Sequence, residues 1–163
     1  MTTALRPTRH ATMMDIARTI AKRSTCARRQ VGCVLTDAYG RVLSMGHNGV
    51  PRGHTHCTEH PCPGVGLASG AGLEQCQAIH AEQNALMFCS DITKIRACYV
   101  TASPCPHCVK MLLNTECRIV IYDESYAVTP WKWLDDAGVA SFCYTEKDKI
   151  EAFMQLPEKN PRA

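Results

Sequence analysis

Two short segments of this 163-residue chain carry the residue types that could perform chemistry. The first contains His80 and Glu82, and the second contains Cys105 and Cys108 in the order Pro-Cys-Pro-His-Cys. One histidine and two cysteines can hold a zinc ion through three protein ligands, which leaves the fourth tetrahedral position for water. Glu82 is not needed as a ligand, and a carboxylate beside a metal-bound water is what a proton-transfer reaction requires. The two segments therefore predict a hydrolytic zinc centre in which Glu82 carries the proton.

A structural zinc site is the alternative interpretation of the cysteines. It would use four sulfur ligands, from Cys57, Cys62, Cys105 and Cys108. The histidine and the carboxylate of the first segment would then have no role. The catalytic interpretation accounts for all four residues of the two segments, and we therefore prefer it.

Length and composition limit the number of domains and the kind of protein that this chain can be. At 163 residues the chain is expected to form one domain, 1–163, with a core at about 10–156 and tails at 1–9 and 157–163. Hydrophobic residues make up 45% and charged residues 20%, and no apolar run approaches the roughly 20 residues of a membrane span. The eleven cysteines are an odd number with metal-ligand spacing, which favours reduced thiols in a cytoplasmic protein without a secretory signal.

The charge is unevenly distributed along the chain, although the net charge is only +3. Residues 1–56 hold 9 Lys and Arg against 2 Asp and Glu, whereas residues 57–163 hold 9 against 13. A basic first third suits an anionic ligand such as a nucleotide phosphate. This basic region lacks the dense basic patch of a nucleic-acid-binding protein. Some of its charged residues are explained by an ordinary solvated surface.

Hydrophobic periodicity predicts the elements that must position the chemical residues. Apolar residues recur every three or four positions in residues 10–22, which predicts an amphipathic helix. The runs 31–36 and 41–46 flank an Asp-Ala-Tyr-Gly turn and predict a hairpin. Cys33 and Met45 are expected in the core of this hairpin.

The second half of the chain predicts strands that alternate with helices. Helices are expected at 78–89, 106–114, 131–137 and 146–155, and strands at 97–101, 118–122 and 139–144. A hairpin followed by such alternation predicts a mixed sheet covered on both faces. Both metal-ligand segments then lie at helix N-termini, where the helix dipole favours thiolate over thiol.

Four stretches together resemble the deoxycytidylate (dCMP) deaminase family, over about residues 15–144. They are Arg-Arg-Gln-Val-Gly-Cys-Val-Leu at 28–35, Gly-His-Asn-Gly-Val-Pro-Arg-Gly at 46–53, Ile-His-Ala-Glu-Gln-Asn-Ala at 79–85 and Thr-Ala-Ser-Pro-Cys-Pro-His-Cys at 101–108. The His-x-Glu and Pro-Cys-x-x-Cys motifs are shared by the whole cytidine deaminase-like superfamily. The second stretch is specific to the family, which usually has tyrosine where this chain has His47.

The resemblance implies a three-layer α/β/α fold with a central mixed five-stranded sheet. It implies that dCMP, and 5-substituted dCMP as a further candidate, is deaminated with Glu82 and Zn²⁺, which supplies dUMP for thymidylate synthesis. Family members are usually homohexamers, and many are activated by dCTP with Mg²⁺ and inhibited by dTTP. The corresponding allosteric site would include His47, Gly49 and Arg52.

The resemblance also implies which residues bind the substrate. The expected contacts are Arg28, Arg29, Asn48, Ala81, Ser103 and Tyr126. Asn48 would contact the deoxyribose and the base, the Ala81 backbone would meet the base edge, and Tyr126 would close over the substrate. The two arginines are phosphate candidates because an arginine fork fits phosphate, with exposed charge as the alternative. For Asn48 the alternative is a role in an Asn-Gly turn.

The segment 48–77 is long for a loop inside a compact domain, and such loops are usually functional or held by something. Some dCMP deaminases carry a second, structural zinc here, with ligands at the positions of Cys26 and Cys57. A closed set of four sulfurs would comprise Cys26, Cys57, Cys62 and Cys76. The alternative replaces one cysteine by His56 or His60. The remaining cysteines are expected in the core, namely Cys33, Cys89, Cys98, Cys117 and Cys143.

Two other functions compete with dCMP deamination. One is deamination of free cytidine or deoxycytidine, or of a base in tRNA, and the loop at 46–53 and the long insertion disfavour it. The other is a zinc-binding regulatory protein with a deaminase-like fold, which would have no need of Glu82. The expected partners are a small nucleotide substrate and other copies of the chain, with no nucleic acid and no membrane.

Overall fold

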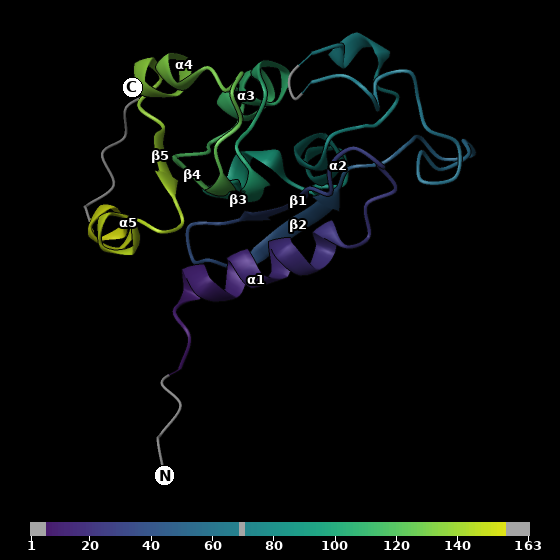
Figure 1. Ribbon diagram of the computed structural model, residues 1–163. Helices are drawn as coiled ribbons and strands as arrows, with labels where there is room; N and C mark the ends of the chain where they lie inside the picture. Colours follow the sequence, from purple (N-terminus) through teal and green to yellow (C-terminus); the bar gives the residue numbers. More distant parts are fainter. Residues whose placement is uncertain (1–5, 69–70, 156–163) are drawn as a thin grey trace.

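A mixed five-stranded sheet organises residues 6–68 and 71–155, the part of the chain that the computed structural model describes (Figure 1). Its strands are β1 (Gly32–Thr36), β2 (Val42–His47), β3 (Ala97–Ala102), β4 (Ile119–Glu124) and β5 (Ala140–Cys143). They lie in the order β2-β1-β3-β4-β5. The pairs of β1 with β2 and of β1 with β3 are antiparallel, whereas β3, β4 and β5 are parallel. The predicted mixed sheet is confirmed.

Helices cover both faces of this sheet (Figure 1). They are α1 (Arg9–Ala21), α2 (Ala81–Met87), α3 (Pro106–Leu113), α4 (Trp131–Asp136) and α5 (Lys147–Met154), with short 3-10 turns η1 (Leu73–Gln75) and η2 (Ile92–Lys94). Neighbouring residues of one strand point to opposite faces. Cys33 therefore packs with the layer of α2, α3 and α4, whereas Val34 packs with α1 and α5. The three-layer α/β/α prediction is confirmed.

The helix expected at 78–89 is shorter in the structure. Gly49 and Ile79 form an antiparallel bridge, with backbone N–H···O distances of 3.1 and 2.8 Å. Because residue 79 is extended in this bridge, α2 can begin only at Ala81, and His80 becomes its N-cap residue. The other helices and strands lie within two residues of their expected bounds.

Two expectations about the core are wrong. Met45 is 45% exposed because β2 turns Ser44 and Gly46 inward and Met45 outward. Cys143 is only partly buried, since it ends the edge strand β5. Cys89 follows the end of α2 and is partly buried, but it packs against the core. The buried cysteines of the expected core set are Cys33, Cys98 and Cys117.

A bidentate salt bridge connects helix α1 to the end of β4. Nε and Nη2 of Arg18 donate to the two carboxylate oxygens of Asp123 at 2.9 and 2.7 Å. The same guanidinium lies 4.8 Å from the centroid of the Tyr144 ring. A bidentate contact between an arginine and a carboxylate fixes the relative orientation of the two side chains as well as the distance between them. The end of β4, which leads toward the chemical residues, is therefore held from the opposite layer.

The tails expected at 1–9 and 157–163 fall largely outside the described residues, which begin at Arg6 and end at Gln155. Within the described residues, no helix has the length and apolar character needed to cross a membrane.

The packing of α1 gives a stability prediction. Met14 is fully buried between α1 and the sheet, so Met14→Ala should lower the free energy of unfolding by about 2–5 kcal/mol. The matched control is Met45→Ala in β2, where the side chain is 45% exposed and the expected change is within about 0.5 kcal/mol. Urea denaturation followed by circular dichroism measures both, and equal losses would contradict the assignment of Met14 to the core.

Candidate active site and metal centre

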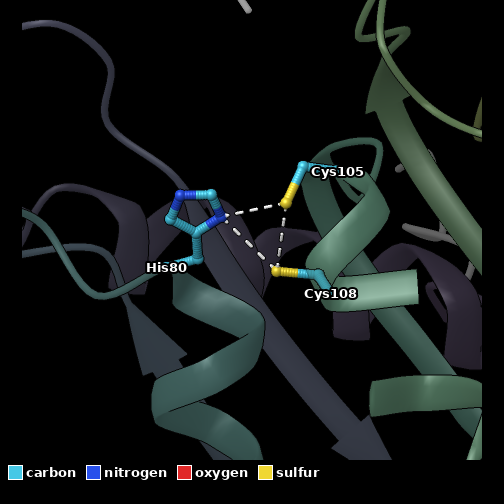
Figure 2. Close-up of side chains that lie close together, drawn as sticks. All are labelled: His80, Cys105 and Cys108. Carbon is cyan, nitrogen blue, oxygen red and sulfur yellow. Dashed lines mark hydrogen bonds between the residues drawn. The ribbon is translucent and has the colours of Figure 1, made fainter. Parts of the chain in front are cut away.

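Three side chains from two distant segments meet in one cluster (Figure 2). Nδ1 of His80 lies 3.3 Å from Sγ of Cys105 and 3.4 Å from Sγ of Cys108, and the two sulfurs are 3.6 Å apart. Among the described residues, these three form the group of histidine, cysteine and acidic side chains whose ligand atoms all lie within 4.8 Å of one another. The structure thus brings together the three ligands predicted for the catalytic zinc.

The first turns of helices α2 and α3 determine the positions of the three ligands. His80 precedes α2, and its backbone N–H donates to Oε1 of Gln83 at 2.8 Å. Cys105 precedes α3, which has Pro106 at its first position, where the missing N–H costs nothing. Cys108 follows one helical turn later, so its sulfur lies on the same side as that of Cys105.

Hydrogen bonds within the cluster prepare Cys105 as a metal ligand, whereas Cys108 and His80 would have to release their protons when a metal binds. The hydrogen bond with Cys108, together with His80, lowers the pKa of Cys105 to about 3, which favours the thiolate form of this sulfur. The pKa of Cys108 is raised, first by its hydrogen bond to Cys105 and then by burial. The hydrogen bond with Cys105 also raises the pKa of His80. Two sulfurs and one imidazole nitrogen are ligands that zinc prefers, and three of them leave one position open. The residues fit a catalytic zinc.

Glu82 lies in the first turn of α2 and is only 4% exposed. Burial raises the pKa of its carboxyl group to about 7, and a favourable interaction with His80 offsets part of this rise. A carboxyl group with a pKa near neutrality can both accept and return a proton. Glu82 lines the same cavity as His80 and Cys105, as a proton carrier must.

The cavity beside the cluster has a volume of about 500 Å³, a size typical of small-molecule sites. Its walls come from the segment 26–31 before β1, the end of β3, the turn after β4, the start of α2 and the long loop after β2. They include all the expected substrate contacts, namely Arg28, Arg29, Asn48, Ala81, Ser103 and Tyr126. Their individual contacts with a substrate stay predictions.

Asn48 uses its amide to fix the chain beside the cavity. Its Nδ2 donates to the carbonyl of Arg29 at 2.7 Å, and its Oδ1 accepts from the N–H of Val31 at 2.8 Å. The side chain is nearly buried at 7% exposure. Asn48 therefore holds the segment that carries Arg29 against the end of β2.

The two adjacent arginines differ in their contacts. Arg28 donates three hydrogen bonds to the carbonyls of Ala68 and Ala71, so it is engaged with the long loop. Arg29 donates to Oε2 of Glu124 at 3.0 Å, and its guanidinium carbon lies 5.5 Å from the centroid of the Tyr126 ring. Within the described part of the chain, Nη1 of Arg29 is buried without a hydrogen-bond partner. Arg29 thus has a donor left for a ligand.

Two residues that contact the cavity wall from behind were not expected from the sequence. Thr129 has its hydroxyl 2.8 Å from that of Ser103, and Glu124 pairs with Arg29. The parallel pairing of β3 with β4 brings their carboxyl ends together, and this is the edge where ligands bind in such sheets. That rule is the signal that could have pointed to residues 123–129.

The second cysteine set is partly assembled. Cys26, Cys57 and Cys62 are buried and Cys76 is half-buried. The backbone N–H of Cys62 donates to Sγ of Cys57 at 3.4 Å, and the side chains of Cys62 and Cys76 also hydrogen-bond. The set does not form a group of ligand atoms within 4.8 Å of one another, in contrast to the His80 cluster. A second zinc stays a prediction.

The three expected allosteric residues lie outside the cavity wall. His47 ends β2 and its carbonyl accepts from Nδ2 of Asn84 in α2 at 2.7 Å. Gly49 forms the bridge with Ile79, and Arg52 is exposed in the loop. Their allosteric role stays a prediction.

Known proteins match the chain over the region that builds the site. Residues 7–124 match the family model for the cytidine and deoxycytidylate deaminase zinc-binding region. The chain belongs to this family. It is 37% identical to the deoxycytidylate deaminase of Mycobacterium phage D29 over 116 residues, which cover 67% of this chain and 89% of the phage protein.

Further relatives extend the family assignment. The deoxycytidylate deaminase of Schizosaccharomyces pombe is 38% identical over 125 residues, or 74% of this chain. The chain spans only 38% of the length of that relative and 50% of the Saccharomyces cerevisiae one. The crystal structure of dCMP deaminase from the cyanophage S-TIM5 in complex with dCMP and dUMP is similar, with a TM-score of 0.69 and 28% identity. The match covers 85% of this chain and 98% of the cyanophage one.

The cluster geometry gives a metal-binding prediction. Cys108→Ser should remove zinc from the site, because a serine hydroxyl is a much poorer zinc ligand than a thiolate. His107→Ala is the matched control, since this exposed histidine lies between the two cysteine ligands and is not part of the cluster. Metal analysis of the purified variants measures the zinc content. Equal zinc content in the Cys108 variant and the control would contradict the assignment.

Proposed function

We propose that this protein converts dCMP and water to dUMP and ammonia. The observation that carries the proposal is a buried carboxylate, Glu82, beside a three-ligand zinc site in the wall of a cavity large enough for a nucleotide. The cyanophage enzyme crystallised with dCMP and dUMP, which shares the fold and 28% of its residues, supports the same substrate here.

The residues of the site divide the reaction between them. A zinc ion held by His80, Cys105 and Cys108 would supply an activated water by lowering the pKa of that water toward neutrality. Glu82 accepts the proton of the attacking water and delivers it to N3 of the cytosine ring. The C4–O bond forms, the C4–N4 bond breaks, and Glu82 passes the second proton to the departing amino group. Its pKa near 7 suits both directions of transfer.

Arg29 is the best-supported partner for the substrate phosphate. Its Nη1 is buried and unpaired within the described residues, while its Nη2 is held by Glu124. A buried N–H donor without a partner is costly, so a phosphate oxygen that accepts from Nη1 would remove this cost. Arg28 is less suited, because its hydrogen bonds go to the loop carbonyls.

The loop is proposed to hold a second, structural zinc at Cys26, Cys57, Cys62 and Cys76. The support is the contact of Cys62 with two of the other cysteines and the burial of three of the four. A closed four-sulfur site would fix a loop that has little secondary structure of its own.

Assembly, compartment and regulation are proposed from weaker support. Exposed apolar side chains on the α2–α4 layer suit a homo-oligomer, a hexamer by the family resemblance; they include Met87, Phe88, Met111 and Trp133. The eleven free cysteines suit the reducing cytoplasm. Regulation by dCTP with Mg²⁺ and by dTTP at His47, Gly49 and Arg52 is supported by the hydrogen bond of His47 to α2, the helix that carries Glu82.

The substrate is tested by an ultraviolet assay of dCMP, deoxycytidine and 5-methyl-dCMP, with and without dCTP and dTTP. We expect kcat/KM for dCMP to exceed that for deoxycytidine by at least about 100-fold, since the phosphate contacts are charge-assisted. Glu82→Gln should keep its zinc and lose nearly all turnover, because the amide cannot accept the water proton. Equal rates on both substrates would refute the monophosphate assignment, and full activity of the variant would refute the role of Glu82.

The second zinc is tested by metal stoichiometry. The wild-type chain should contain about two zinc ions, and Cys62→Ser should reduce this to about one while the catalytic zinc remains. Cys89→Ser is the matched control, because Cys89 is partly buried and has no place in either set. A wild-type content of one zinc per chain in fully active protein would remove the proposal.

A further inference from the structure

One buried hydroxyl connects the metal-ligand segment to the far wall of the cavity. Ser103 lies two residues before Cys105 and is only 2% exposed. Its backbone N–H donates to the carbonyl of Glu124 at 2.9 Å, which extends the pairing of β3 with β4 beyond the strand ends. The Ser103 side chain is thus fixed at the carboxyl ends of two parallel strands.

The Ser103 hydroxyl receives two partners from the turn after β4. The backbone N–H of Tyr126 donates to its Oγ at 2.6 Å, and Oγ1 of Thr129 lies at 2.8 Å. The turn itself is closed by the N–H of Thr129, which donates to the carbonyl of Tyr126 at 3.0 Å. Thr129 is 7% exposed, so water does not compete for these bonds.

The bonding capacity of a serine hydroxyl makes this arrangement specific. The oxygen has two lone pairs and one hydrogen, and Tyr126 occupies one lone pair. Whichever of the two hydroxyls donates to the other, Oγ of Ser103 is bonded from both sides. The backbone of Tyr126 is therefore fixed relative to the segment that carries Cys105. The ring of Tyr126 is held separately, by the guanidinium of Arg29.

We propose that Thr129, through Ser103, is a positioning residue that fixes Tyr126 in the wall of the substrate cavity. Tyr126 lines this cavity together with Glu82 and Cys105. Only the kinetic test of this inference depends on the proposed deamination of dCMP. Because Tyr126 has no part in the proton route of Glu82, its placement affects how firmly the substrate is held in the ground state and the transition state alike. Thr129 then acts on the substrate through Ser103 and Tyr126.

The kinetic test is Thr129→Val, which keeps the shape of the side chain and removes the hydroxyl. We expect KM for dCMP to rise roughly fivefold with kcat within about twofold, as the loss of one neutral hydrogen bond suggests. Thr129→Ser should restore KM, because it returns the hydroxyl. In a Tyr126→Ala background, Thr129→Val should have no further effect on KM. An unchanged KM, or an equal effect in both backgrounds, would overturn the proposal.

The matched control is Thr115→Val. Thr115 is also buried, and its hydroxyl donates to the carbonyl of Leu112 and accepts from the N–H of Cys117, away from the cavity. This variant should lose stability to a similar extent as Thr129→Val and leave KM unchanged. A KM that rises equally in both variants would assign the effect of Thr129 to general destabilisation and would overturn the positioning role.

A second readout needs no catalysis. Hydrogen exchange in the substrate-free protein, followed by mass spectrometry of peptides that span residues 123–131, reports the protection of the Tyr126 amide. Ser103→Ala and Thr129→Val should both accelerate exchange there relative to Thr115→Val, and unchanged protection would overturn the proposal. If the wild-type chain does not deaminate dCMP, the proposed function fails, and the exchange experiment alone decides the positioning role.

Discussion

The bridge between Gly49 and Ile79 is the constraint on which the site depends. Its two backbone hydrogen bonds keep residue 79 extended and fix the first residue of α2. If the helix began one turn earlier, the side chain of His80 would lie on a helical surface and not at the helix entrance. A Cβ at Gly49 would lie 2.5 Å from Oγ1 of Thr25, so the hydroxyl of Thr25 would have to shift. Gly46 is more restricted, since a Cβ there would lie 2.4 Å from the backbone carbonyl of Ala81. Gly46 and Gly49 thus have a packing role.

The chemical core of the site is carried by local sequence, and this explains why it could be predicted. His80 and Glu82 are two residues apart, and Cys105 and Cys108 are one helical turn apart, so short motifs report them directly. The layers were predictable for a related reason, because the periodicity of strands and helices is local. The bounds of α2 were not, since they depend on a bridge to a residue 30 positions away. Met45 was misplaced because nothing in an alternating run states which face is inward.

Contacts between distant residues were the ones that the sequence left undetermined. Arg28 and Arg29 are adjacent and chemically identical, yet one contacts the loop carbonyls and the other contacts Glu124 and Tyr126. Only the fold separates them, because the two side chains leave the backbone in different directions. The hydroxyl pair of Ser103 and Thr129 joins two loops. The sequence around Thr129 contains no recognisable motif. Positioning residues of this kind are visible only once the strand ends are placed in space.

The engagement of Arg28 with the loop has a consequence for how the protein can change over time. The carbonyls of Ala68 and Ala71 accept hydrogen bonds from the guanidinium of Arg28. Without these bonds, this cation would be free to bind a ligand in the cavity beside Arg29. An insertion or deletion that moves these two carbonyls would release that cation and would leave the zinc ligands and Glu82 in place. Loop length is therefore a route by which relatives of this chain can evolve a preference for ligands with more negative charge, while the zinc ligands and the proton carrier stay the same.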